Sequence, residues 1–274
     1  GFKHRKTNIK IIDSEIQIYE NFLKDTAKKL KNAGSPYSYV SMGSTMVCTV
    51  EAYYAVGGMP KKKATEDFYF LQALSKFCTV ESINEELIFP SSRPISRVHL
   101  GTGFRMKQVQ NGLRISSLYF DENAFEYLAQ WIAIVKNCWD LNITSLLSKT
   151  NKIHPQFNTF IKEEGISNVW KKLQQNSKSH QQFINQFHRW FDGLKTIKLL
   201  FVGITYGVIP LVFKQSSQLT KKQRSLIKLV DKKGVIDIKH LCKKYSSEIV
   251  AIFSIIEETL VFLKKVSDNV PIQK

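Results

Sequence analysis

The 274-residue chain carries 40 lysines and arginines against 23 aspartates and glutamates, so its formal net charge at pH 7 is +17. Hydrophobic residues make up 43% and aromatic residues 12% of the sequence, which is enough to bury a sizeable core and excludes global disorder. The positive charge favours anionic partners, namely a membrane surface, nucleic acid or a phosphorylated ligand, and does not choose among them.

The four cysteines are widely scattered, without the Cys-x-x-Cys or Cys/His spacing of a metal site: Cys48, Cys78, Cys138 and Cys242. We predict reduced, mostly buried thiols of a cytosolic protein, with neither a zinc site nor a disulfide framework. The sequence begins Gly-Phe-Lys and shows no secretory or transit segment, so we expect it to lie within a longer gene product.

Helices and short strands are predicted to alternate in the first part of the chain. Apolar positions recur at helical spacing from Asp13 to Leu30, and Gly34 supplies a stop. Strands are predicted over residues 37–40, 46–50 and 80–89, with helices over 51–56 and 67–77 between them. The pair Gly57-Gly58 permits positive φ and a sharp exit from the first of these helices.

From Glu122 onward the pattern predicts long amphipathic helices, interrupted at Pro155. An aromatic and apolar stripe at helical spacing is predicted to be core: Phe183, Phe187, Trp190, Phe191 and Leu194. Residues 199–213 are nearly continuously apolar but shorter than the roughly 20 residues that a spanning helix needs. A buried segment is the favoured interpretation of 199–213, and an interfacial one comes second.

Several short motifs follow one another in a fixed order. Thr65-Glu66-Asp67 places two adjacent carboxylates at the start of a predicted helix, where Thr65 suits the N-cap and acidic residues suit the first turn. The other motifs of the set are Gly43-Ser44-Thr45, Val56-Gly57-Gly58-Met59, Arg93-Pro-x-x-Arg97 and Gly101-Thr102-Gly103. In this order they resemble the second half of the catalytic domain of family 2 glycosyltransferases, in particular a bacterial subgroup. These enzymes have the GT-A fold and transfer a sugar from a nucleotide donor with inversion.

The resemblance implies an α/β fold, namely a partial GT-A fold with a remnant sheet and helices, followed by a mostly α-helical C-terminal region. Residues 1–117 would form the acceptor-side half of the transferase domain, without its nucleotide-binding half. Residues 118–214 would form the helical C-terminal region and 215–274 a basic helical appendage. The resemblance is good from about Asp13 to Arg105 and fades towards residue 200.

In this resemblance Asp67 matches the general base that takes the acceptor hydroxyl's proton, and Glu66 binds or orients the acceptor. Gly43, Ser44 and Thr45 match the floor of the active site, where hydroxyls bond a sugar; a simple strand-entry turn weighs equally. Arg93, Arg97 and the run Gly101-Thr102-Gly103 match a loop that closes over the donor diphosphate. The alternative for that loop is a solvated basic segment.

The sequence departs from the family in one respect. The nucleotide-binding half, ending in an Asp-x-Asp motif that holds Mg or Mn on the donor diphosphate, should precede these motifs, and no Asp-x-Asp occurs in the chain. We therefore expect the C-terminal portion of a longer hexosyltransferase-like enzyme of cell-envelope polysaccharide synthesis, inactive by itself. Its partners would be a nucleotide-sugar and a glycan or lipid-linked acceptor. The enzyme would be cytoplasmic, with peripheral binding at the inner face of the cell membrane as one option.

Two non-catalytic interpretations stay open. Residues 215–274 have an order of helices and a short apolar run that resembles a winged helix-turn-helix, which would bind nucleic acid. Alternatively, the lysine-rich faces and the segment 199–213 would serve a membrane-surface interaction protein.

Overall fold

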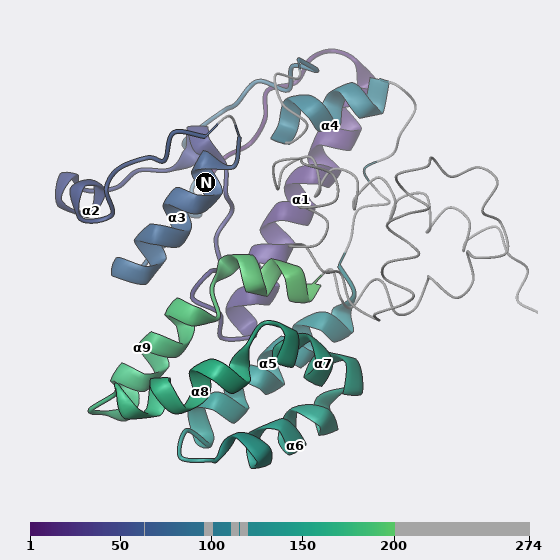
Figure 1. Ribbon diagram of the computed structural model, residues 1–274. Helices are drawn as coiled ribbons and strands as arrows, with labels where there is room; N and C mark the ends of the chain where they lie inside the picture. The colour runs from purple at the N-terminus through teal and green to yellow at the C-terminus, as the bar shows by residue number, and fades with distance from the viewer. Residues whose placement is uncertain (63, 96–100, 111–114, 116–119, 201–274) are drawn as a thin grey trace, which may run out of the picture. The chain divides into compact units, whose positions relative to one another are not determined.

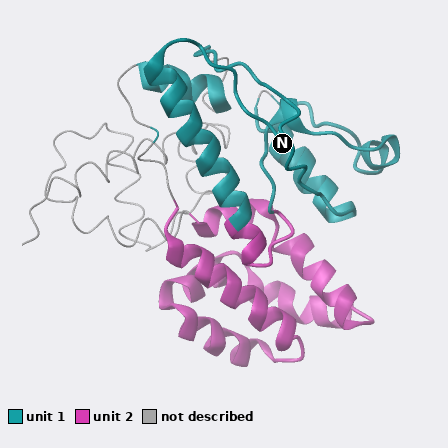
Figure 2. Ribbon diagram, turned by 180° about the vertical axis from the view of Figure 1, so that it is seen from behind, with its two compact units in different colours: residues 1–28, 38–119, 238–274 teal, residues 29–37, 120–237 magenta. Residues whose placement is uncertain are grey.

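The computed structural model describes residues 1–62, 64–95, 101–110, 115 and 120–200 (Figure 1). The chain divides into two compact units (Figure 2). The first comprises Gly1–Lys28, Ser38–Tyr119 and Ile238–Lys274, and the second Lys29–Tyr37 and Phe120–Asp237. Part of each unit lies outside the described residues, which end at residue 200. They therefore include neither most of the apolar segment 199–213 nor the predicted appendage 215–274. The predictions for those two segments therefore remain predictions.

The described residues are about 65% helical and about 2% strand. The described helices of the first unit are α1 (Lys10–Asn32), the 3₁₀ turn η1 (Gly43–Thr45), α2 (Val50–Ala55), α3 (Glu66–Phe77) and α4 (Gly101–Gln110). The last turn of α1 belongs to the second unit. The second unit has α5 (Glu122–Asn137), α6 (Ile143–Ile153), α7 (Pro155–Glu163), α8 (Ile166–Gln175) and α9 (His180–Trp190).

The predicted α/β fold with a remnant sheet is wrong for the described residues. Extended pairing is limited there to two isolated parallel bridges, Phe2 with Ile88 and Arg5 with Ser91. Pro90 lies between the bridged positions and has no N–H to extend a ladder. Apolar side chains of the predicted strands lie in solvent, with Val47 84% and Leu87 59% exposed. Their β-branched and aromatic composition predicted strands, but a stable sheet also needs neighbouring strands and a buried face.

Small apolar clusters hold the first unit together. Ile12 and Ile16 of α1 pack against Met106 and Val109 of α4. Helices α2 and α3 share a second cluster around Phe70. The side chains of His4 and Glu20 are also buried in the first unit. The His4 backbone N–H and the His4 Nδ1 both lie within hydrogen-bond distance of one Glu20 oxygen.

The second unit is built around a large aromatic core. The Trp131 ring lies at the centre, with the rings of Phe157, Phe187 and Phe191 packed edge-on against it at centroid distances of 5.9, 5.5 and 6.2 Å. Leu199 and Leu200, which begin the apolar segment, are also buried in this core. Phe183, Phe187 and Phe191 of the predicted stripe are therefore core and Trp190 packs against it partly buried, whereas Leu194 is only half-buried.

Local signals placed the helix ends well. Helix α7 begins at Pro155, and Gly34, Gly57 and Gly58 have positive φ angles of 81°, 76° and 75°. The predicted helices over 51–56 and 67–77 correspond to α2 and α3. The cysteine prediction is wrong in part, because Cys48 and Cys78 are exposed and Cys138 is half-buried. Cys242 lies outside the described residues.

Replacing Phe187 with alanine tests the aromatic core. Phe187 is fully buried against Trp131, so Phe187→Ala should lower the free energy of unfolding of the second unit by about 3–5 kcal/mol. Urea unfolding followed by tryptophan fluorescence measures this, since all four tryptophans lie at 131–190. Lys171, which is exposed on α8 of the same unit, supplies the control: Lys171→Ala should change stability by less than about 0.5 kcal/mol. Equal effects of both substitutions would contradict the described core.

Candidate functional site

The candidate site lies at the first turn of α3. Thr65 precedes the helix with φ 64° and ψ 11°, a left-handed conformation that is strained for a β-branched residue. Its hydroxyl donates to the Ala64 carbonyl and does not cap the helix, so the predicted side-chain cap is wrong. The strained turn instead sets the direction in which the chain enters α3, and thereby the position of Glu66 and Asp67.

Two backbone N–H groups fix the Asp67 carboxylate. Gly43 N–H donates to Oδ2 at 3.1 Å, and Phe68 N–H donates to Oδ1 at 2.7 Å. Burial raises the pKa of Asp67 above its ordinary value of 3.8 and the charge of Glu66 adds to this, while the two N–H groups oppose it. Asp67 is therefore a half-buried, oriented carboxyl group that is a stronger base than an exposed aspartate.

The Asp67 charge reaches Tyr19 of another helix, which also contacts Arg105. Arg105 of α4 is buried, 5% exposed, and is hydrogen-bonded to Tyr19 of α1. Burial raises the pKa of Tyr19; the Arg105 charge lowers it, and the Asp67 charge raises it again. Tyr19 thus interacts electrostatically with both Arg105 and Asp67 within the first unit. The sequence placed Tyr19 on an apolar helix face and Arg105 in the loop matched to the donor diphosphate, and it did not link the two residues.

The segment Gly43-Ser44-Thr45 forms the turn η1 beside Asp67. Ser44 is exposed, whereas the Thr45 hydroxyl donates to the Met42 carbonyl at 3.0 Å. A Cβ built on Gly43 would lie 3.7 Å from the Asp67 Cβ, which is ordinary contact. Gly43 therefore contributes its N–H group to the site, and the space around it does not require a glycine.

The predicted donor loop is described only in part. Arg93 is exposed, and Arg97 lies outside the described residues. Gly101, Thr102 and Gly103 form the first turn of α4, so the prediction that they lie in a loop is wrong. A Cβ on Gly103 would lie only 2.1 Å from the Ile95 carbonyl oxygen, so close backbone approach requires glycine there. The structure brings Gly43 to Asp67 but does not show Arg93 reaching them.

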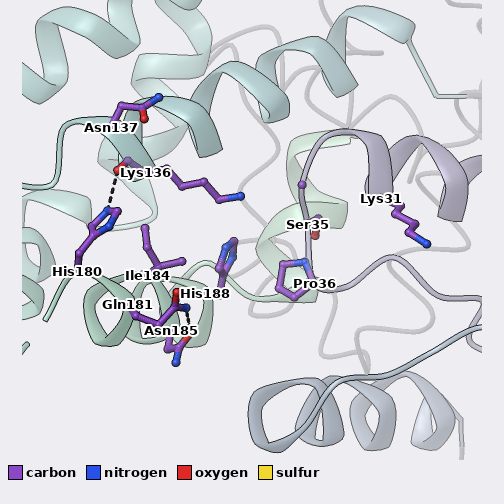
Figure 3. A pocket seen from close by; sticks show the side chains of 11 residues that line it. Lys31, Ser35, Pro36, Lys136, Asn137, His180, Gln181, Ile184, Asn185 and His188 are labelled. Carbon is purple, nitrogen blue, oxygen red and sulfur yellow. Dashed lines mark hydrogen bonds between the residues drawn. The ribbon is translucent and has the colours of Figure 1, made fainter.

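A cavity of about 550 Å³ opens in the second unit (Figure 3). It contains none of the predicted site residues. Its basic lining comes from Lys31 of α1, Lys136 of α5, and His180 and His188 of α9. Amide side chains complete the polar wall: Asn137, Gln181 and Asn185. No aspartate or glutamate is among the residues that line it.

Lys136 and His188 both line this cavity, Lys136 as an exposed residue and His188 as a half-buried one. The Lys136 side chain extends towards His188 in Figure 3, and its Nζ would lie 3.6 Å from a Cβ built on Gly34. Burial, together with the charge of Lys136, lowers the pKa of His188 from 6.5 to about 4. The Tyr37 hydroxyl donates to the His188 carbonyl at 2.5 Å, which holds this part of α9 in place.

A divalent cation has no set of ligands among the described residues. They contain no group of three histidine, cysteine, aspartate or glutamate side chains that could hold one. Likewise, within residues 1–200 as far as they are described, no helix is long and apolar enough to cross a membrane. Comparisons of the chain with protein-family models, with curated proteins and with solved structures found no match.

Proposed function

We propose that the chain is the acceptor-side portion of an inverting glycosyltransferase, with Asp67 as its general base. The observation that carries the proposal is the Asp67 carboxyl group, which is oriented by two N–H donors and has a raised pKa. A raised carboxyl pKa makes the ionised Asp67 carboxylate a stronger base, which favours proton transfer from the acceptor hydroxyl. The motif order around Thr65-Glu66-Asp67 supplies the reaction class.

In the proposed reaction the acceptor hydroxyl oxygen attacks the anomeric carbon of the donor sugar. Its proton passes to an Asp67 oxygen while the bond from the anomeric carbon to the nucleotide diphosphate breaks. Each Asp67 oxygen accepts one backbone hydrogen bond and keeps a lone pair for this proton. Glu66, on the same helical turn, would orient the acceptor.

The donor contacts are proposed from residue chemistry. Arg93 and Arg97 would bind the diphosphate through their guanidinium groups, and the N–H groups of Gly101-Thr102-Gly103 suit an anion as a helix N-terminus does. Ser44 and Thr45 would bond sugar hydroxyls. In this proposal the nucleotide-binding residues and any cation ligands lie outside this sequence, and the proton transfer to Asp67 does not involve them.

Asp67→Asn tests the proposal in a longer chain that carries a nucleotide-binding half ahead of these residues. Loss of the base should lower kcat for sugar transfer about 10²–10⁴-fold, measured as release of the nucleoside diphosphate. The matched control is Glu81→Gln, which removes an exposed carboxylate elsewhere in the same unit and should leave kcat unchanged. The 274-residue chain alone should transfer no sugar.

Stability measurements separate a chemical effect from a folding defect. Because the folded-state pKa of Asp67 is raised, its ionisation disfavours the folded state as pH rises from 3.8 through the raised pKa, and this effect persists at neutral pH. Asp67→Asn should therefore unfold at the same denaturant concentration as the parent or at a higher one. Full activity in a folded Asp67→Asn enzyme, or transfer by the 274-residue chain alone, would refute the proposal.

We propose further that the protein works in the cytoplasm at the inner membrane face. The net charge of +17 supports this, because anionic headgroups attract clustered lysines and arginines. Cosedimentation with vesicles containing phosphatidylglycerol should be strong at low salt and weak at about 0.5 M salt, where charges are screened over a few ångströms. Vesicles of phosphatidylcholine alone serve as the control. Equal sedimentation with both vesicle types, or with neither, would contradict this placement.

A further inference from the structure

We propose that the cavity of the second unit is a binding site for a small ligand that carries a phosphate group. This inference is independent of the proposed glycosyltransferase activity. Three properties of the cavity carry it: the sign of its charge, its size, and the polar groups of its wall.

The charge of the lining has one sign. The charged side chains of the lining are Lys31 of α1 and Lys136 of α5, and no carboxylate is among the described residues that line the cavity to balance them. Within the described part of the chain, neither lysine takes part in an ion pair. An anion that enters the cavity would therefore meet cations without displacing a protein carboxylate.

Lys136 and His188 are held in a repulsive arrangement. The field of Lys136 and the burial of His188 together keep the imidazole neutral at pH 7. The other titratable groups that line the cavity, Lys31 and His180, are also basic, so nothing there offsets Lys136. A phosphate group between Lys136 and His188 would favour both positive charges and so remove the repulsion.

The orientation of His180 adds polar capacity. Its Nε2 lies 2.7 Å from the Lys136 carbonyl oxygen, which only accepts, so Nε2 carries a proton and donates this hydrogen bond. Gln181 Nε2 donates to Asn185 Oδ1 at 3.0 Å, which orders two amides along the same helix. These donors and acceptors suit the hydroxyl groups of a sugar or a similar polyhydroxy group attached to the phosphate.

The size of the cavity agrees with a small organic ligand. Its volume of about 550 Å³ lies within the range of roughly 300–1,000 Å³ that is typical of small-molecule sites. A single ion would fill little of it. A phosphate ester of a polar organic molecule therefore fits the cavity better than free phosphate. The experiment compares these two ligands.

The simpler role for Lys136 is structural. It is near the end of α5, and its ammonium group lies over Gly34, just past the end of α1, where a positive charge interacts favourably with helix carbonyls. That role requires no ligand and predicts no change on adding one. Ligand titration therefore distinguishes the two roles.

The experiment titrates the 274-residue chain, with ¹³C-labelled histidine, with glucose 6-phosphate, inorganic phosphate and glucose. Glucose 6-phosphate should shift the His188 signals saturably below about 20 mM and raise the pKa of His188 by about 1. Lys136→Met should weaken this binding at least about tenfold. The control Lys149→Met, at an exposed position on α6, should change the Kd less than about twofold. Tryptophan fluorescence checks that each variant is folded, and Lys136→Gln replaces Lys136→Met if that variant is not.

Tighter binding of glucose 6-phosphate than of inorganic phosphate would identify a phosphate ester, and equal binding would identify free phosphate; both support the proposal. Glucose binding as tightly as glucose 6-phosphate would overturn it. So would the absence of any saturable shift, or binding that neither Lys136 variant weakens. None of these results depends on sugar transfer, so failure here leaves the assignment of Asp67 untouched.

Discussion

The hydrogen bond from the Gly43 backbone to the Asp67 carboxylate is the interaction on which the candidate active site depends. It joins the turn η1 to the first turn of α3, two segments 24 residues apart in the sequence. The left-handed Thr65 directs the chain into α3 so that this bond can form. Partial burial then opposes ionisation of Asp67 while the N–H donors favour it, and burial prevails. A group balanced in this way suits proton transfer better than one buried without partners or fully exposed.

The second unit rests on a different kind of interaction. Its described helices meet around the Trp131 ring, where close aromatic packing fixes the unit. His188 follows Phe187 on α9, so the same helix that fills the core also presents an imidazole to the cavity. Different interactions therefore position the two proposed sites. Hydrogen bonds at a strained turn position Asp67, and the aromatic core positions the helix that carries His188.

Helical periodicity and end signals predicted much of this fold, because both are local. Pro155 at the start of α7 and the positive φ of Gly34 follow from backbone constraints at those residues. The strands were predicted wrongly because apolar β-branched residues such as Val47 indicate a strand only if a neighbour and a buried face exist. The sequence also predicted Asp67 and Gly43 as site residues, but not the electrostatic interactions of Tyr19 with Arg105 and Asp67. Tyr19 and Arg105 come from helices far apart in the chain, and no local pattern places them together. Lys136 and His188 also lie on different helices, so no local pattern predicts that the Lys136 charge lowers the pKa of His188.

The pH dependence of kcat/KM is the measurement that tests the role of Asp67 most directly. In an enzyme that carries both halves, the acid limb should report the Asp67 pKa and lie above pH 3.8. Because the negative charge of Glu66 raises that pKa, Glu66→Gln should move the acid limb to lower pH. An acid limb that Glu66→Gln does not move, or that persists unchanged in Asp67→Asn, would contradict the assignment of Asp67 as the base.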